Sequence, residues 1–121
     1  MSSANNQIST VDEIQSYLRD NRSLRINGEV IPHVICSDGF KMSVQVGRRA
    51  WGLCCTPKND EGPWSHVEVG YPSAIEPLLW PYAAKYNDAD CISSTEAVYP
   101  YTPIELVAAV IDAHGGLVWV R

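Results

Sequence analysis

The sequence predicts an α+β fold in which an antiparallel sheet of about four to six strands packs against two or three helices. Residues 40–70 contain runs of alternating apolar and polar side chains separated by turn residues, as in a meander of strands. Residues typical of helix starts lie before and after these runs. The length, 121 residues, is that of one domain. We therefore expect a flexible tail over residues 1–9 and a single α+β domain over residues 10–121.

The first helix is predicted to begin at Thr10. Thr10 and Glu13 have the spacing of a capping box, in which the threonine hydroxyl accepts from the Glu13 amide and the glutamate reaches back. Apolar residues then recur at helical spacing, namely Val11, Ile14 and Leu18. We expect this helix to end near residue 19.

Five segments in the first seventy residues have the alternation or the β-branched content of strands. They span residues 24–31, 33–36, 40–46, 50–56 and 64–70. The last three are close enough in sequence to pair as an antiparallel meander. In the final one, Val67 and Val69 are expected to face the core. Trp64, His66 and Glu68 should then share the opposite face.

A second helix is predicted after these strands. Ser73 and Glu76 again have capping-box spacing, and apolar residues follow them. Pro81 is expected to stop this helix. The polar run 85–95 should be irregular, and a short extended piece is expected at residues 98–99.

The most complete helix start lies near the end of the chain. Thr102 is the candidate cap, a proline follows it at the first helical position, and Glu105 is the acidic residue of the first turn. The helix should span residues 103–114 and pack on the inner face of the sheet. The Gly115-Gly116 pair can adopt the left-handed conformation that ends helices, and a last strand is expected over residues 117–120.

Charge is distributed unevenly along the chain. Residues 1–60 contain seven Lys/Arg and six Asp/Glu, whereas residues 61–121 contain two and eight, a net charge of −6 for the second half. Such a chain lacks the basic surface needed for nucleic acid, so we expect no direct nucleic-acid contact. An acidic half suits a protein partner with a basic surface. The simpler interpretation is that the charge keeps a small protein in solution.

The cysteines are expected to be thiols in a reducing cytosol, because the polar N-terminus does not resemble a signal peptide and no segment is long and apolar enough for a membrane. They are Cys36, Cys54, Cys55 and Cys91. Adjacent Cys54 and Cys55 would point to opposite faces of a strand and could not easily bind one metal. His33 and Cys36 have loose ligand spacing without a second pair. We therefore expect neither a metal nor a cofactor.

One catalytic arrangement is compatible with the spacing of the residues. A thiol at Cys54 or Cys55 could approach His66 and Glu68 on the neighbouring strand. However, no local motif surrounds either cysteine, and no nucleotide-binding or calcium-binding motif occurs. His114 is expected to act at a helix C-terminus, where the helix dipole favours its charge. We predict a protein without enzymatic activity, and a cysteine-dependent or metal-dependent enzyme is an alternative.

A binding surface is the remaining interpretation. Arg and Trp are enriched in interface hot spots, and adjacent arginines can also hold a phosphate. The candidate contacts are Arg48, Arg49, Trp51, Lys58, Glu61, Trp64, His66, Glu68, Asp88 and Asp90. In a meander the first two loops lie at opposite ends of the sheet, so each group would bind separately. The alternative is a hairpin with solvated charges and a tryptophan that covers the sheet edge.

A series of short motifs extends over residues 37–116. They are DGFKMSVQ at 38–45, CTPK at 55–58, EGPW at 61–64, VEVGYPS at 67–73, YPYTP at 99–103 and HGG at 114–116. This series resembles a family of small proteins of bacteriophages and prophages. The chain departs from that family at Lys58, where the family has Arg, and at 100–103, where it has Gly-Tyr-Val-Pro. The N-terminal helix is an addition.

The resemblance implies a phage-encoded counter-defence protein of the anti-CRISPR type, in the cytoplasm of the bacterial host cell. Such a protein would bind a host immune effector complex and inhibit it by stoichiometric occlusion. One alternative is a sponge that sequesters a cyclic nucleotide immune signal. Others are a small enzyme and a phage accessory protein. We expect no membrane contact, and a homodimer is a further expectation because a short meander leaves an edge strand to cover.

Overall fold

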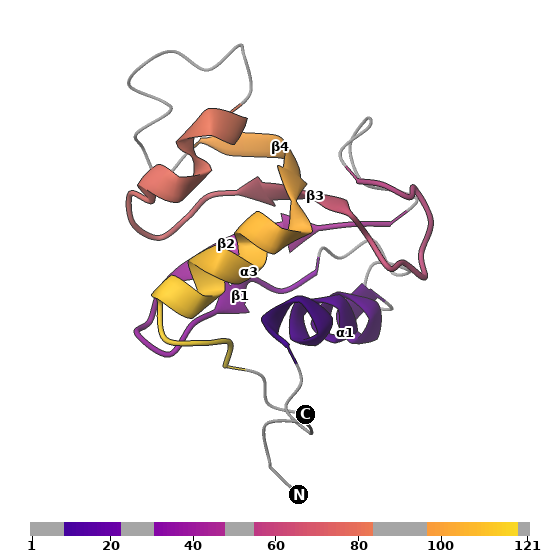
Figure 1. Cartoon of the computed structure of the whole chain (residues 1–121), viewed down its shortest axis with the longest axis horizontal. Coiled ribbons are helices and arrows are strands. Elements are labelled where there is room, and N and C mark those ends of the chain that lie inside the picture. Colours follow the sequence, from indigo (N-terminus) through magenta and orange to yellow (C-terminus); the bar gives the residue numbers. More distant parts are fainter. Residues whose placement is uncertain (1–8, 23–30, 48–54, 84–96, 119–121) are drawn as a thin grey trace, which may run out of the picture.

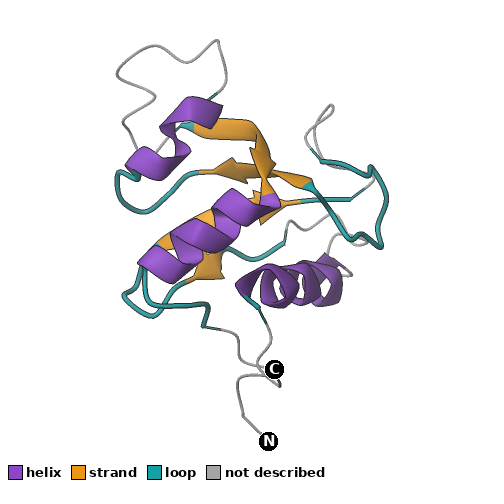
Figure 2. Cartoon of the chain, in the orientation of Figure 1, coloured by secondary structure: helices purple, strands orange, loops and turns teal. Residues whose placement is uncertain are grey.

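The computed structural model describes residues 9–22, 31–47, 55–83 and 97–118. In chain order its elements are α1 (Thr10–Arg22), β1 (Val34–Ile35), β2 (Lys41–Gln45), β3 (His66–Gly70), the 3-10 helix η3 (Pro77–Tyr82), β4 (Val98–Pro103) and α3 (Ile104–Ala113). Helices α1 and α3 lie over one face of a single sheet, and η3 lies beside β4 (Figure 1). Figure 2 shows the same arrangement by type of element. The predicted α+β class is confirmed.

The strands pair in chain order, β1-β2-β3-β4, and every pairing is antiparallel. Because β2 pairs directly with β3, the strand predicted over residues 50–56 does not lie between them. Thr56 makes an isolated bridge to His66, whereas residues 48–54 lie outside the described residues. Most of the strand predicted over residues 24–31 also lies outside them.

The alternation in β2 and β3 places their apolar side chains in the core. Val44, Val67 and Val69 are fully buried, as predicted for the two valines of β3. Ser43 and Glu68, which alternate with these apolar residues in β2 and β3, are only partly buried and lie on the other face. Helices α1 and α3 complete the core with Ile14, Leu18, Val107, Val110 and Ile111.

Helix α1 begins at a different cap from the predicted one. The Ser9 hydroxyl accepts from the Asp12 amide at 3.1 Å, so Ser9 caps the helix. Thr10 donates instead to Oδ1 of Asp112 at 2.6 Å, which joins the start of α1 to the end of α3. The prediction of a cap at Thr10 is therefore wrong, because this hydroxyl has a tertiary partner.

The helix predicted from Ser73 is the short 3-10 helix η3, which begins at Pro77. Its two prolines lack amide donors and so favour a short helix. Glu76 caps it, since Oε2 accepts from the Leu78 amide at 3.1 Å. The Ser73 hydroxyl accepts from the Lys41 amide at 2.9 Å and caps no helix.

Helix α3 matches the predicted span 103–114 closely, but no side chain caps its start. Thr102 belongs to β4, and its hydroxyl donates to the Tyr99 carbonyl at 3.0 Å. At the other end Gly115 and Gly116 have φ values of 92° and 104°, as predicted for the end of this helix. Within the described residues of the predicted last strand, Leu117 makes an isolated bridge to Cys36, and the Val118 amide donates to the Ile35 carbonyl at 2.8 Å.

Candidate functional site

Half of the predicted contact residues lie outside the described residues, namely Arg48, Arg49, Trp51, Asp88 and Asp90. The other half can be placed. Lys58 and Glu61 lie in the loop before β3, and Glu61 is exposed whereas Lys58 is partly buried. His66 and Glu68 lie on β3 and are partly buried. Trp64 differs from all of these.

Trp64 is a core residue. It is 1% exposed, and its indole N–H donates to the Asn59 carbonyl at 3.1 Å. The Gln15 side chain pairs with its backbone, donating to the Trp64 carbonyl at 2.6 Å and accepting from the Trp64 amide at 2.9 Å. The prediction of Trp64 as an interface contact is therefore wrong, because the ring packs inward and its polar groups are satisfied within the chain.

His66 is part of an aromatic stack at the surface. Its ring lies on that of Tyr101 with centroids 4.1 Å apart and planes at 6°. Nδ1 of His66 is 3.0 Å from the Ser65 hydroxyl, and the Tyr101 hydroxyl shares a hydrogen bond of 2.8 Å with Thr56. These contacts fix the orientation of the imidazole.

The two cysteines that the structure describes are buried. Sγ of Cys55 lies 3.5 Å from the Gly47 carbonyl and 3.7 Å from the Pro57 carbonyl, and its single S–H can donate to either oxygen. Burial, and then the charge of Asp38, raises the pKa of Cys36 to about 11. A protonated, buried thiol is a poor nucleophile. Of the two candidate nucleophiles, Cys55 is buried, and Cys54 lies outside the described residues.

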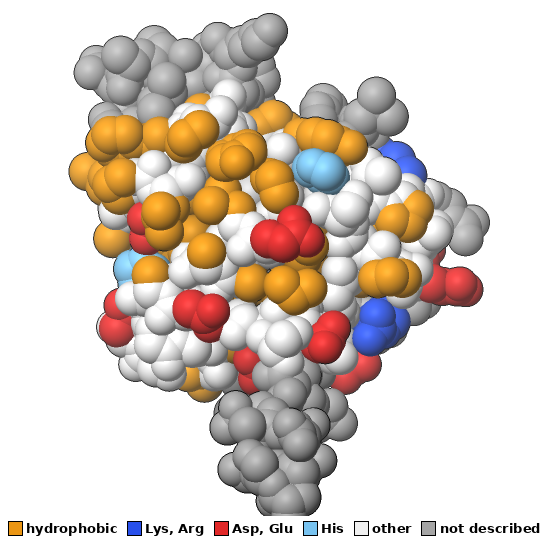
Figure 3. Space-filling model, in the orientation of Figure 1, with side chains coloured by type: hydrophobic (Ala, Val, Ile, Leu, Met, Phe, Trp, Pro, Cys, Tyr) orange, Lys and Arg blue, Asp and Glu red, His pale blue; other side chains and the backbone are white. Residues whose placement is uncertain are grey.

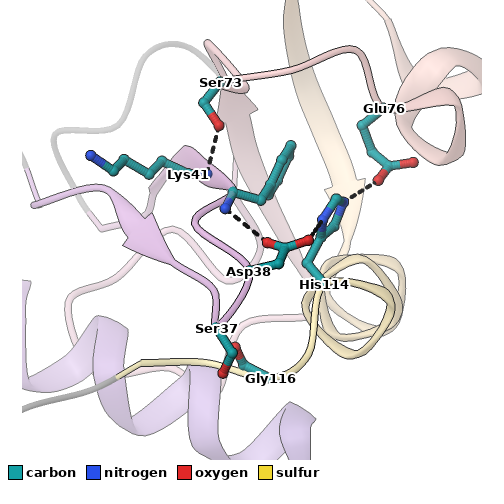
Figure 4. Close-up of polar contacts among 8 residues, drawn as sticks. Ser37, Asp38, Lys41, Ser73, Glu76, His114 and Gly116 are labelled. Carbon is teal, nitrogen blue, oxygen red and sulfur yellow. Dashed lines mark hydrogen bonds and ion pairs between the residues drawn. The ribbon is translucent and has the colours of Figure 1, made fainter.

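A histidine between two carboxylates joins three parts of the fold. Nδ1 of His114 is 2.6 Å from Oδ2 of Asp38, and Nε2 is 2.6 Å from Oε1 of Glu76. Figure 4 shows Asp38 coming from the turn before β2, His114 from the end of α3 and Glu76 from the start of η3. Phe40 stacks on the imidazole with centroids 4.0 Å apart. We call Asp38, His114 and Glu76 the His114 cluster.

The His114 cluster favours the imidazolium form. Partial burial lowers the pKa of His114, but hydrogen bonds and charges of Glu76 and Asp38 outweigh it, so the pKa lies above its usual value of 6.5. The amide of Phe40 is the main cause that lowers the pKa of Asp38, and the hydrogen bond from His114 is the next. A protonated ring donates to both carboxylates, which explains two short contacts at once.

The His114 cluster is better suited to a structural role than to catalysis. Both ring nitrogens are occupied, so neither is available as a general base. The adjoining pocket, of about 250 Å³, is below the usual volume of a small-molecule site, roughly 300–1,000 Å³. Its lining residues are Asp38, Gly39, Phe40, Ser73, Ala74 and His114. Among the described residues, no three His, Cys, Asp or Glu side chains are arranged to hold a metal ion.

A group of exposed apolar side chains lies next to this cluster in sequence. Their exposed fractions are 56% for Tyr71, 57% for Ile75, 43% for Leu78, 39% for Trp80 and 36% for Tyr82. In Figure 3 hydrophobic side chains gather over η3 and the adjoining strand. We call these five residues the η3 surface. Large apolar groups gathered on one part of a surface are typical of interaction sites.

The backbone at Tyr71 is strained. Its φ of 52° lies in the left-handed region, which bulky residues rarely adopt. The Tyr71 amide donates to the Ala97 carbonyl at 3.1 Å, which helps to hold this conformation. The strain therefore accompanies a large ring that points out of the core.

Neither the His114 cluster nor the η3 surface was predicted from the sequence. Apolar residues after Ser73 predicted the buried stripe of a helix, whereas Leu79 is the buried residue of η3. The prolines at 77 and 81 could have indicated that these side chains are exposed. They shorten the helix, so most of its apolar side chains do not pack against the core. Asp38 and His114 are 76 positions apart, and Glu76 and His114 are 38 apart, so no local pattern linked them.

Neither a family model, nor a curated protein, nor a solved structure matches the chain. None of the described helices is both long and apolar enough to cross a membrane.

Proposed function

We propose that this protein binds another protein through the η3 surface and inhibits it by occupying part of its surface, without turnover. The observation that carries this proposal is the exposure of five large apolar side chains between residues 71 and 82. Single exposed apolar residues are normal on a protein, but a group of them is a typical interaction site.

The composition of the η3 surface supports a protein partner. Trp and Tyr are among the residues that contribute most to protein interfaces, and Trp80, Tyr71 and Tyr82 supply three such rings. Strain of the kind found at Tyr71 is concentrated in binding and catalytic sites, where the surrounding fold maintains it. Both features favour a surface that is ordered before the partner arrives.

The charges around the η3 surface favour a partner with a basic rim. The described segments 71–83 and 97–118 contain the exposed carboxylates of Glu105 and Asp112 in addition to the buried Glu76, and they contain no Lys or Arg. Acidic side chains lie below the apolar area in Figure 3. A partner with an apolar centre and basic groups around it would complement this face.

The resemblance to bacteriophage and prophage proteins supplies the biological setting of the proposal. In that setting the partner is a component of a bacterial immune effector complex, and the protein is a counter-defence inhibitor in the host cytoplasm. The cyclic-nucleotide sponge would use Arg48, Arg49 or Lys58 to hold phosphate, and Lys58 is the one of these that the structure describes.

Photo-cross-linking followed by binding measurements tests this proposal. A photoreactive residue at Leu78 or Ile75 should capture the same host protein, whereas the same residue at Arg19, exposed on α1, should not. The purified partner should then bind with 1:1 stoichiometry in calorimetry. Trp80→Ala should weaken binding by at least about tenfold, as expected for a hot-spot residue. Arg19→Ala is the matched control.

Two results would overturn the proposal. One is a partner whose affinity is unchanged by both Trp80→Ala and Leu78→Ala while both variants remain folded. The other is capture of a second copy of this chain from Leu78, which would assign the η3 surface to self-association. A cyclic nucleotide that raises the melting temperature of the protein would favour the sponge instead.

A further inference from the structure

Building on the proposed function, we propose that the His114 cluster is a proton-controlled latch for the η3 surface. With His114 protonated, the cluster holds the start of η3 in its binding arrangement. Loss of that proton releases the Glu76 side of the cluster, and the affinity for the partner falls as pH rises. The cluster would thus regulate a surface that lies beside it.

The side chain of Glu76 connects the His114 cluster to the η3 surface. Oε1 of Glu76 contacts Nε2 of His114, while Oε2 of the same carboxylate accepts from the Leu78 amide. Leu78 belongs to the η3 surface, and Ile75 directly precedes Glu76 in sequence. A displacement of the Glu76 carboxylate therefore changes the cap of η3 and the position of two exposed apolar residues.

The Asp38 side of the cluster is held independently of the His114 proton. The Asp38 amide donates to the His114 carbonyl at 3.1 Å, and the Ser37 amide donates to the Gly116 carbonyl at 2.9 Å. Asp38 Oδ1 also accepts from the Phe40 amide at 2.8 Å. These bonds do not depend on the charge of the ring. The Glu76 side is therefore the one that should move.

Glu76 should be released because deprotonation of His114 leaves too few donors for the two carboxylates. A neutral imidazole has one donor nitrogen and one acceptor nitrogen, so it cannot donate to two carboxylates at once. One ring nitrogen would then face a carboxylate oxygen without a proton between them. Because Glu76 is buried, its charge would also lose the nearby cation that compensates it. Outward rotation of Glu76 relieves both problems.

Other charged or titratable groups close to the His114 imidazole do not take over its role in holding Glu76. Asp112, on the same helix as His114, accepts from Thr10. Cys36 is buried and remains protonated over the range in which histidine titrates, since its pKa is about 11. The Lys41 ammonium points away from the ring in Figure 4. Within the part of the chain that the structure describes, Asp38 and Glu76 are thus the charged groups in direct contact with His114.

Fluorine NMR of protein labelled with 5-fluorotryptophan tests the latch without any partner. The Trp80 resonance, assigned by its loss in Trp80→Phe, should shift with pH in step with the titration of the His114 imidazole. In His114→Gln it should stay near its high-pH position at every pH. Glu76→Gln, which keeps an oxygen for the Leu78 amide, should also lose the shift. His33→Gln, at an exposed histidine, should titrate like the wild type.

Failure of the latch and failure of the proposed function give different results. A Trp80 resonance that ignores the His114 titration, or that still follows it in His114→Gln, overturns the latch whether or not the η3 surface binds a protein. With the partner in hand, wild-type affinity should fall by about tenfold or more across the His114 titration, and affinity of His114→Gln should not vary. Trp80→Ala and Leu78→Ala should weaken binding at every pH, and unchanged affinity in both folded variants would overturn the proposed function alone.

Discussion

Gln15 satisfies both backbone groups of Trp64, a residue 49 positions away in sequence. The amide side chain is well suited to this task because it has one donor and one acceptor group side by side. All of these groups are buried, so water cannot replace the glutamine if it is removed. The same arrangement recurs between Gln45 and the backbone of Ile31, with both distances at 3.0 Å.

Replacing Gln15 with Leu should destabilise the protein by about 2 to 4 kcal/mol. The change leaves a buried N–H and a buried C=O without partners, and each costs about 1 to 3 kcal/mol. Urea unfolding followed by circular dichroism measures the loss. Arg19→Leu, an equally apolar change on the exposed side of the same helix, should alter stability by less than about 0.5 kcal/mol. Equal stability of Gln15→Leu and the wild type would contradict the proposed role.

Replacing Tyr71 separates the cost of strain from the loss of the ring. Tyr71→Gly and Tyr71→Ala both remove the ring, but glycine alone is relaxed at a φ of 52°. The left-handed conformation costs a residue with a Cβ about 1 to 2 kcal/mol, which the greater freedom of unfolded glycine partly offsets. We therefore expect Tyr71→Gly to be more stable than Tyr71→Ala by about 0.5 to 1 kcal/mol in urea unfolding. The opposite order would show that Tyr71 is not strained.

At the scale of single residues, the sequence predicted burial better than partners. The alternation correctly placed Val67 and Val69 in the core, because a strand has a period of two whatever its neighbours are. It wrongly placed Trp64 on the surface with His66 and Glu68. Trp64 precedes β3, which begins at His66, so the alternation of the strand does not apply to it. The partners of Gln15 and His114 depend on tertiary contacts that no local pattern encodes.

At the scale of elements, hydroxyl groups that looked like helix caps have other uses. Thr10 connects two helices, and Ser73 accepts from the backbone of β2. The Thr102 hydroxyl donates to a carbonyl of its own strand. Cap signals rest on short spacings that recur by chance, so tertiary partners can override them. The elements themselves were predictable because their periodicity is spread over many residues, as in α1, β2 and α3.

The His114 cluster should make stability depend on pH, because it joins the turn before β2, the end of α3 and the start of η3. The pKa of His114 is raised above 6.5, so its stabilising contribution is complete below that value and is lost as pH rises through the raised pKa. The pKa of Asp38 is lowered from 3.8, so its contribution is lost as pH falls through the lowered pKa.

Urea unfolding over a range of pH checks this expectation. The free energy of unfolding of the wild type should fall on the alkaline side of the His114 titration. At low pH His114→Gln should be less stable than the wild type, and on the alkaline side its stability should change little with pH. His33→Gln serves as the control and should keep the wild-type profile. An identical alkaline limb in His114→Gln and the wild type would mean that another group is responsible.

At the scale of the whole molecule, the sheet has one face covered by α1 and α3, and η3, which carries the apolar surface, lies beside β4 and also contacts α3 (Figure 1). Strand β4 ends the sheet, and its Pro100 and Pro103 lack the amide donors that edge pairing needs. The homodimer stays a prediction, and we do not expect it to form through that edge. The η3 surface is the better candidate for any association.

Charge should govern how fast the partner associates, because the chain has a net charge of −5. With a basic partner, the association rate constant should fall as ionic strength rises, while the dissociation rate constant should change little. Trp80→Ala should do the opposite and mainly speed dissociation. Stopped-flow or surface-plasmon kinetics at several salt concentrations measures both. An association rate that does not vary with salt would exclude a basic rim on the partner.

Hydrogen exchange of the complex with the partner tests the proposed binding surface most directly. Peptides covering residues 71–83 should exchange more slowly in the complex than in the free protein, because binding there removes the amides around η3 from water. Peptides from α1 should exchange at the same rate in both states. Protection over α1 or over the loop at residues 57–63, with none at residues 71–83, would contradict the proposal that the η3 surface binds the partner.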